Sequence, residues 1–356
     1  MPWPAARGAH RRGFLSGALA LAACAPKAKS QPPVRIAPLK SAAPFPVGSC
    51  IQAAQLDDPA FAELVAAQVS QLTPEWELKM EYVVQPDGGY RFDAPDRIAG
   101  FCADHGLRLF GHTLVWYAEA PDAFARLEGP AFRDAFGAYV GAVVGRYRGR
   151  AVAWDVVNEA VAEDGDGWRD SLWSQRLGRL DHMRLAYDLA RAADPEAELF
   201  LNDYNLESNP RKRATFLALA ETLLRAGAPL TGLGTQTHVA ADLPPGAIAT
   251  ALRDLASLGL KVRISEMDVS LSRTRGLFAG PDEMRARQSR LYGEAAEAFA
   301  ALPDRQRFDF TFWGLEDSKS WLRRENAADA PLLFDDAGRP KPAAAAWEAA
   351  LQGVGG

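Results

Sequence analysis

Two glutamates, Glu159 and Glu266, are the strongest candidates for chemistry in this sequence. Glu159 lies at the end of the apolar run VAWDVVNEA at 152–160, and Glu266 lies in LKVRISEMDV at 260–269. Two carboxylates that flank a glycosidic bond can divide the work, because one protonates the leaving oxygen while the other attacks the anomeric carbon. The alternative is that each glutamate only forms an ion pair with a nearby Arg or Lys. It is disfavoured because both stand beside Asn, His or Trp rather than in a charged stripe.

Other polar side chains recur at the ends of apolar runs. They are His112, Asn158, Asn202, Asp203, Gln236, His238 and Trp313. Enzymes built on a closed barrel of parallel strands work at the C-terminal ends of those strands. Any one of these residues could cap a loop or be a hydrogen-bonded core group. An inert barrel, however, has no reason to collect amides, imidazoles and carboxylates at so many strand ends.

The elements that must position these residues are short apolar runs separated by stretches with helical spacing. The runs lie at 47–52, 69–73, 107–116, 152–160, 198–203, 230–239, 260–269 and 308–317. Near-continuous apolar strands that alternate with helices predict a parallel sheet covered by helices. No linker divides residues 46–352, which favours a single α/β domain, a (β/α)8 TIM barrel, over two doubly wound domains. RPKPAAAAW at 339–347 is expected to begin the closing helix, with Pro near its first turn.

Composition excludes several classes of partner. The 356-residue chain is 48% hydrophobic and 24% charged with a formal net charge of -5, and it has no basic run beyond the N-terminus. We therefore expect no nucleic-acid partner, and we expect a monomer. No CxxC or His-rich spacing suggests a metal, and we expect no cofactor. Cys50 and Cys102 could form a disulfide in an oxidising compartment or remain two buried thiols, and the sequence does not decide between these.

The first 24 residues predict a bacterial export signal. Arg11-Arg12-Gly13-Phe14-Leu15 is a twin-arginine pattern that begins the apolar stretch FLSGALALAACA, which is too short to span a bilayer and has the length of a signal-peptide core. Leu21-Ala22-Ala23-Cys24 resembles a lipoprotein box, which would put a lipid anchor on Cys24. The alternative is an ordinary signal with an incidental cysteine. The protein is thus expected to be periplasmic, lipid-anchored or secreted, with residues 25–45 as a flexible linker.

Several longer motifs follow one another in order over about residues 46–350. They are GHTLVW at 111–116, WDVVNEA at 154–160, NDYN at 202–205, Gln236-Thr237-His238, ISEMDV at 264–269, WGLEDSKSW at 313–321 and PLLFDDAGRPKPA at 331–343. This ordered set resembles family 10 of the glycoside hydrolases, the family of retaining endo-β-1,4-xylanases. The resemblance implies that Glu159 is the general acid/base and Glu266 the nucleophile. It also implies a β-linked oligo- or polysaccharide as the substrate.

The resemblance implies binding roles as well. The implied sugar-binding residues are Glu75, Lys79, His112, Trp116, Asn158, Tyr204, Gln236, His238, Trp313 and Trp321. Asn158 would donate to the sugar 2-hydroxyl, a bond that strengthens as charge builds at the anomeric carbon. His238 would hydrogen-bond Glu266, with Asp268 fixing the imidazole tautomer. The indoles offer flat faces to pyranose rings, whereas Trp154, inside a strand, is expected to be core.

The segment after the second run departs from the family pattern. The family usually reads T-x-E-N-x-x-K-W, whereas this chain has Trp76 in place of the Asn and Met80 in place of the Trp. Tyr117 stands where the third-run motif usually has His. The resemblance implies that the Asn of this segment contacts a hydroxyl of the second sugar from the cleavage point. Because an indole has one donor, no acceptor and more bulk than an amide, Trp76 either stacks on a sugar or narrows the subsite for that sugar.

Three functions follow from these observations. The first is retaining hydrolysis of β-1,4 bonds in xylan or xylo-oligosaccharides, with carboxyl groups about 5–5.5 Å apart. The second is the same reaction on a different β-glycoside, with Trp76 and Tyr117 reshaping the non-reducing side. The third is a non-catalytic sugar-binding lipoprotein, which the intact pair of glutamates with Asn158 and His238 disfavours.

Overall fold

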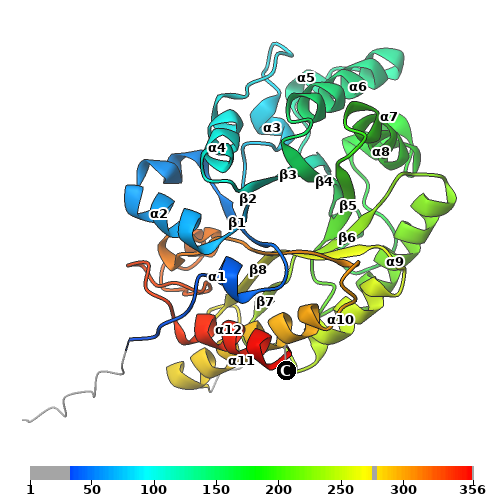
Figure 1. The fold of residues 1–356 in the computed structure, drawn as a ribbon. Helices are drawn as coiled ribbons and strands as arrows, with labels where there is room; N and C mark the ends of the chain where they lie inside the picture. The colour runs from blue at the N-terminus through cyan, green and yellow to red at the C-terminus, as the bar shows by residue number, and fades with distance from the viewer. Residues whose placement is uncertain (1–32, 275–278, 355–356) are drawn as a thin grey trace, which may run out of the picture. The chain divides into compact units, whose positions relative to one another are not determined.

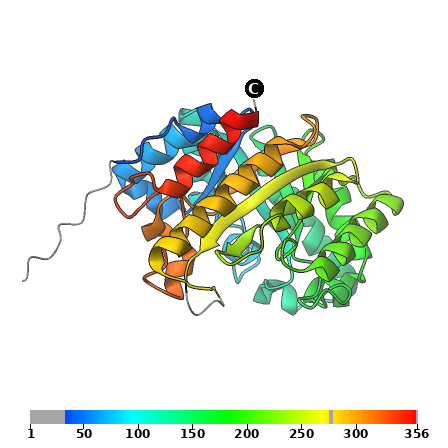
Figure 2. The same cartoon turned by 90° about the horizontal axis from the view of Figure 1, so that it is seen from below.

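The chain forms a barrel of parallel strands enclosed by helices (Figures 1 and 2). The computed structural model describes residues 33–274 and 279–354, so the predicted export signal lies outside the described residues. Within that part, no helix is long and apolar enough to cross a membrane. The predicted fold class is confirmed.

The strands follow the predicted apolar runs. Their bounds are β1 (Val47–Ile51), β2 (Gln71–Pro74), β3 (Arg108–Trp116), β4 (Ala151–Asn158), β5 (Glu198–Asp203), β6 (Gly232–Thr235), β7 (His238–Ala240), β8 (Lys261–Ser270) and β9 (Arg307–Phe312). Neighbours pair in parallel in the order β6-β5-β4-β3-β2-β1-β9-β8, and a β6–β8 pairing closes the ring. β7 continues the line of β6 after a break and pairs with β8. Each predicted run thus supplies one strand position of the barrel, and the run at 230–239 supplies two short strands, β6 and β7, at one position.

The helices cover the outside of the ring. Their bounds are α1 (Leu39–Ala42), α2 (Pro59–Gln68), α3 (Met80–Val83), α4 (Asp93–Asp104), α5 (Asp122–Ala125), α6 (Gly129–Arg146), α7 (Leu172–Leu177), α8 (Asp181–Ala193), α9 (Pro210–Arg225), α10 (Ala247–Ala256), α11 (Pro281–Ala300) and α12 (Pro342–Val354), with short 3-10 turns η1 (Ala53–Asp57), η2 (Asp317–Lys319) and η3 (Trp321–Arg324). The closing helix starts at Pro342 as expected, and α12 lies beside α11 (Figure 2).

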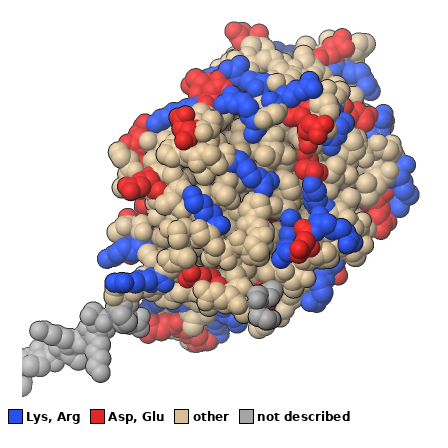
Figure 3. Space-filling view, in the orientation of Figure 1, with Lys and Arg blue, Asp and Glu red and all other residues tan. Residues whose placement is uncertain are grey.

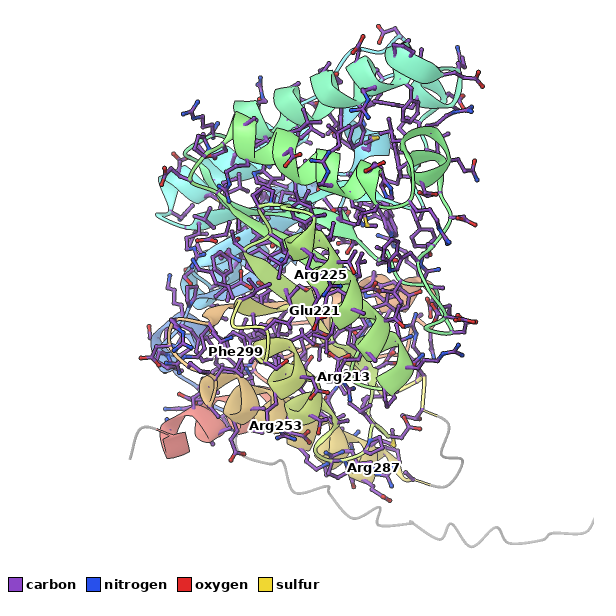
Figure 4. All side chains as sticks on the ribbon, turned by 90° about the vertical axis from the view of Figure 1, so that its right-hand side faces the viewer. Arg213, Glu221, Arg225, Arg253, Arg287 and Phe299 are labelled. Carbon is purple, nitrogen blue, oxygen red and sulfur yellow. The ribbon has the colours of Figure 1, made fainter. Side chains whose placement is uncertain are left out.

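Side-chain caps fix where several of these helices begin. The Asp58 carboxylate accepts hydrogen bonds from the first backbone N–H groups of α2, and the Asn209 amide oxygen accepts one from the start of α9. Each cap is followed by a proline, whose missing N–H costs nothing in the first turn. Farther along α9, Glu221 pairs with Arg225, while Arg213 reaches Asp254 of α10 (Figure 4). The Asn209 cap thus fixes where α9 begins, and the Arg213–Asp254 pair ties α9 to α10.

The folded part begins earlier than the predicted boundary at residue 46. Leu39 is 0% exposed and Phe45 packs edge-on against Phe299 of α11. The Leu39 N–H also donates to the Gln68 side chain at 3.0 Å. The assignment of residues 39–45 to a flexible linker is therefore wrong. The stretch carries no periodicity, yet its two large apolar side chains are buried in the core.

The inside of the barrel combines aromatic packing with buried charge. Phe110, Phe200 and Phe308 form a cluster in which the ring centroids lie 4.8–6.3 Å apart. Arg263 of β8, also fully buried, lies 3.1 Å from Asp155 and 3.0 Å from Asp309. Asp155 in turn lies 2.9 Å from His112 Nδ1, so a line of buried polar contacts runs from the barrel interior up to the strand ends.

The two cysteines of the folded part and Trp154 are all buried. Cys50 and Cys102 are separate buried free thiols, so the two-thiol alternative is the correct one. Trp154 is fully buried, as predicted. On the face seen in Figure 3, acidic and basic side chains are interspersed rather than gathered by sign.

Candidate active site

The C-terminal ends of the strands surround a cavity of about 350 Å³. Every residue predicted to be catalytic or sugar-binding lines it: Glu75, Lys79, His112, Trp116, Asn158, Glu159, Tyr204, Gln236, His238, Glu266, Trp313 and Trp321. Trp76, Asn205, Arg273 and Arg324 line it as well. The sequence marks the two arginines by no motif, because Arg273 follows β8 and Arg324 ends η3, and the position of both segments depends on the folded barrel.

Glu266, from β8, is held as an anion. Asn202 Nδ2 donates to its Oε1 at 2.7 Å, and His238 Nε2 lies 3.3 Å from its Oε2. Burial by itself would raise the pKa of this carboxyl, but the charges of His112, His238 and Lys79 and the His238 hydrogen bond outweigh burial and lower it to about 2. Glu266 is therefore ionised at neutral pH, which is the state that a nucleophile requires.

His238 is sandwiched between two carboxylates. Its Nδ1 lies 2.9 Å from Asp268 Oδ2, and Trp321 Nε1 donates to the same oxygen at 2.8 Å. Burial opposes the charge on the imidazole, but Asp268 and Glu266 raise the His238 pKa to about 10. A doubly protonated ring can donate to both carboxylates at once, so the predicted partnership with Asp268 fixes the orientation of His238 toward Glu266.

Glu159 lies just past the end of β4 in an unusual backbone conformation. Its φ is 58°, in the left-handed region that non-glycine residues seldom adopt. Its backbone N–H donates to the Asn202 carbonyl at 2.8 Å. Gln236 Nε2 donates to its Oε1 at 2.9 Å and Asn158 Nδ2 at 3.3 Å. The strained conformation turns this carboxyl into the cavity, where two amides hold it.

Asn202 links the two carboxyl groups. Besides donating to Glu266, its Nδ2 lies 2.9 Å from Asn158 Oδ1, and Asn158 donates to Glu159. The Asn202 side chain has room for this position because residue 234 is glycine. A Cβ atom at residue 234 would lie 2.4 Å from Asn202 Oδ1. The sequence predicts that Asn202 lies at a strand end but indicates no role for it. The only signal in the sequence is the NDYN motif, because the link joins β4 and β5 to β8, which pairs with neither of them.

The wall nearest β2 carries the departure from the family pattern. Trp76 is 38% exposed, and its Nε1 donates to Glu75 Oε1 at 3.1 Å. Gln52 donates to the other Glu75 oxygen at 3.0 Å. Lys79 Nζ lies 4.4 Å from the Trp76 ring centroid and 4.6 Å from that of Trp116. Both oxygens of Glu75 are thus engaged by protein donors before any sugar arrives.

Two further indoles line the cavity beside the histidines. Trp313 meets His112 edge-on with centroids 5.3 Å apart, and Trp321 meets His238 in the same way at 5.2 Å. His112 is anchored from below by Asp155, so its Nδ1 is occupied. The arrangement leaves indole faces that a pyranose ring could cover.

The opposite wall is built around Tyr204. Its ring lies over Lys212 Nζ at 3.4 Å, and its hydroxyl hydrogen-bonds Glu163 and Arg169. Arg169 also stacks on Tyr117 at 4.1 Å. Tyr117 itself lies outside the cavity and lines a separate void of about 20 Å³ behind Asn158. Its substitution for His therefore acts on the wall rather than directly on a bound sugar.

Comparison with known proteins gives a consistent result. The sequence model of Glycosyl hydrolase family 10 matches residues 38–350. The chain is 35% identical over 322 residues to the endo-1,4-beta-xylanase of Geobacillus stearothermophilus, covering 84% of this chain and 93% of that one. It is 33% identical over 351 residues to endo-1,4-beta-xylanase A of Cellvibrio japonicus, and 32% identical over 315 residues to exoglucanase XynX of Acetivibrio thermocellus.

The coverage of these relatives differs. The match takes in 88% of this chain and 56% of the Cellvibrio protein, and 84% of this chain and 28% of the Acetivibrio protein. Among solved structures, a thermostable mutant of the xylanase Xyn10A from Cellvibrio japonicus superposes with a TM-score of 0.81 at 31% identity, covering 88% of this chain and 99% of that chain. The chain thus spans nearly all of that solved barrel but only part of its longer relatives.

Proposed function

The chain belongs to glycosyl hydrolase family 10, and from that membership we propose that it hydrolyses β-1,4 bonds in xylan or xylo-oligosaccharides with retention of configuration. One observation carries the proposal: Glu159 and Glu266 share a cavity and are joined through Asn158 and Asn202. Retention needs two carboxyl groups in close proximity, on opposite sides of the scissile bond.

In the proposed reaction Glu266 attacks the anomeric carbon while Glu159 gives its proton to the glycosidic oxygen. The carbon–oxygen bond breaks, the leaving sugar departs as an alcohol, and a glycosyl ester forms on Glu266. A water molecule then attacks the same carbon, gives its proton to Glu159 and releases Glu266 as a carboxylate. The pKa of Glu266, lowered to about 2 by His112, His238 and Lys79 against the effect of burial, supports its role in the first step.

The sugar-facing groups support a pyranose chain as the substrate. Trp116, Trp313 and Trp321 line the cavity together with His112 and Lys79. Flat indole faces suit the C–H faces of pyranose rings, and the imidazole and ammonium groups supply donors for hydroxyls.

The direct test is to incubate the protein with xylan and xylohexaose and follow the products by chromatography and proton NMR. Retention predicts that the β-anomer of the newly formed reducing end appears first and then mutarotates. If the α-anomer appears first, the double-displacement mechanism is excluded.

A different β-glycoside is the second candidate substrate, and Trp76 is the observation that favours it. The indole takes the place of an amide beside Glu75, and one relative of similar identity is named an exoglucanase. Aryl β-xylosides, β-glucosides and β-cellobiosides tested side by side separate the two candidates. Inertness toward all of them, with sugar binding retained, would instead support a non-catalytic sugar-binding protein.

The cellular location follows from the N-terminal sequence alone. We infer export by the twin-arginine route from Arg11 and Arg12, with a lipid anchor on Cys24 if the lipoprotein box is used. Mass spectrometry of the mature N-terminus, with Cys24→Ser as the control, tests cleavage of the signal and the lipid anchor.

A further inference from the structure

The strand that carries Gln236 and His238 is interrupted between the two residues. β6 ends at Thr235 and β7 begins at His238. Thr235 lies opposite Ile264 of β8, whereas His238 lies opposite Asp268. Three steps along the broken strand therefore match four along β8, and the chain must change direction in between.

Thr237 makes that change of direction. Its φ is 59° and its side chain is 0% exposed. A β-branched residue in the left-handed region is a strained outlier, and it persists only where its surroundings impose it. Something next to Thr237 must therefore hold it.

Glu207 is the residue in contact with both sides of the break. It lies in the turn between β5 and α9 and is 4% exposed. Its Oε1 accepts the Thr235 hydroxyl at 2.5 Å and the Thr237 hydroxyl at 2.7 Å. Within the described part of the chain its Oε2 has no hydrogen-bond partner, so both hydrogen bonds of this carboxylate go to the two threonines that flank Gln236.

The two residues at the break each contact one of the two catalytic carboxyl groups. Gln236 Nε2 donates to Glu159 Oε1 at 2.9 Å, and His238 Nε2 lies 3.3 Å from Glu266 Oε2. The Gln236 carbonyl also accepts the Glu266 backbone N–H at 3.1 Å. A shift of the break would thus move groups that hold both glutamates.

We propose that Glu207 is a positioning residue: it clamps Thr235 and Thr237 so that Gln236 and His238 are aimed at Glu159 and Glu266. It touches neither substrate nor the reacting atoms, and it acts through the conformation of Thr237. This role rests on the proposed glycosidase function, because it matters for rate only if the two glutamates do the chemistry.

A positioning role differs measurably from simple support of the fold. A variant that is only less folded loses the same fraction of activity on every substrate. Loss of the clamp would misplace both Gln236 and His238. The effect of His238 on Glu266 lowers the rate on every substrate, whereas the effect of Gln236 on Glu159 adds a further loss only where the leaving group needs a proton. A dinitrophenyl β-xylobioside needs little protonation, whereas xylohexaose needs it fully.

The experiment is a double-variant cycle of Glu207→Ala and Thr237→Gly. Glu207→Ala should lower kcat/KM on xylohexaose about 10- to 100-fold and by a smaller factor on the dinitrophenyl glycoside. Glycine adopts the left-handed conformation without a clamp, so adding Thr237→Gly to Glu207→Ala should restore most of the kcat/KM that Glu207→Ala loses. Asp194→Asn is the control, because Asp194 is a buried carboxylate that holds backbone N–H groups of Gly149 and Glu196 outside the cavity. It should leave the ratio between the two substrates unchanged.

Several results would overturn the proposal. They are wild-type kinetics for Glu207→Ala, equal losses on both substrates, or a double variant no better than Glu207→Ala. If Glu207→Ala does not fold, Thr237→Val removes only the hydroxyl and should show the same substrate-dependent loss.

Failure of the proposed function is seen separately, as a wild-type protein inert on both substrates. In that event the crystal structure of the Glu207→Ala or Thr237→Val variant still tests whether Glu207 holds the conformation of Thr237. The clamp predicts that residue 237 leaves the left-handed region and that Gln236 moves out of hydrogen-bond distance of Glu159. An unchanged backbone contradicts it.

Discussion

The indole nitrogen of Trp76 donates a hydrogen bond to Glu75 at 3.1 Å. Burial raises the pKa of Glu75, although Gln52, Arg324 and Lys79 oppose this effect. The carboxylate that the family resemblance assigns to sugar binding is therefore already occupied by neighbouring side chains. Trp76 consequently changes this subsite in two ways, through its bulk and through the acceptor that it consumes.

Replacing Trp76 with Asn should restore hydroxyl recognition at this subsite. The change frees Glu75 Oε1 and supplies a small amide that both donates and accepts. One or two additional hydrogen bonds should lower KM for xylohexaose by about 3- to 10-fold. The kcat on an aryl β-xyloside, which does not reach the subsite, should hardly change.

Trp76→Phe is the matched control. Trp76→Phe keeps an aromatic ring at this position but removes the N–H that donates to Glu75. If the bulk of the ring limits binding, KM for xylohexaose should fall in Trp76→Asn and not in Trp76→Phe. A Trp76→Asn enzyme that binds xylohexaose more weakly than wild type would show instead that the indole stacks on the sugar.

Removal of Glu159 should slow hydrolysis according to the leaving group. Glu159→Ala deletes the proposed proton donor, which contributes roughly 10²–10⁴-fold for alkoxide leaving groups. We expect that loss on xylohexaose and a far smaller one in the glycosylation step of a dinitrophenyl β-xylobioside. Pre-steady-state kinetics measure that step, and Glu159→Gln should reproduce the pattern with side-chain size preserved. Equal losses on both substrates would exclude Glu159 as the acid.

Removal of Glu266 should abolish turnover on every substrate. Without a nucleophile no glycosyl ester can form, so Glu266→Ala should lose roughly 10⁴-fold or more in kcat even with the best leaving group. Incubation of the wild-type enzyme with a slow fluoroglycoside, followed by peptide mass spectrometry, should place the covalent sugar on Glu266. A wild-type rate in Glu266→Ala, or a sugar on another residue, would contradict the assignment.

The sequence predicted the strands and the residues at their ends well, for a physical reason. Strands of a parallel barrel are buried on both faces, so they appear as apolar runs whose ends are marked by polar residues such as Glu159 and His238. Residues 39–45 were misassigned because burial of Leu39 and Phe45 depends on helices far along the chain rather than on local spacing.

Features that depend on several strands at once could not be predicted. The link through Asn202 requires side chains of β4, β5 and β8 to meet inside the barrel, although β8 pairs with neither of the other two strands, and it requires the glycine at position 234. Arg263 stands in a strand pattern like any surface residue, yet it is buried between Asp155 and Asp309 of other strands. The left-handed conformation of Thr237 has no signal in its residue type.

The pair of His238 with Asp268 should make stability fall at alkaline pH. Asp268 and Glu266 raise the His238 pKa, against the effect of burial, from its ordinary 6.5 to about 10. A group whose pKa is raised in the folded state contributes stability that is fully present below the unfolded value. That contribution is lost as the pH rises through the folded value. The free energy of unfolding should therefore decrease between about pH 6.5 and pH 10, by up to about 5 kcal/mol from this group.

Asp268→Asn isolates the effect, because the amide keeps an acceptor for Trp321 Nε1 but removes the charge that holds the proton on His238. Urea unfolding of wild type and variant at pH steps from 6 to 10 should show a difference in unfolding free energy that is largest at the acid end and shrinks toward pH 10. Asp194→Asn, which changes a buried carboxylate far from any histidine contact, should show a constant difference over the same range. A constant difference for Asp268→Asn too would mean that His238 is neutral in the folded protein. Glu266 would then have to be held by Asn202 and Lys79 without a charged imidazole beside it.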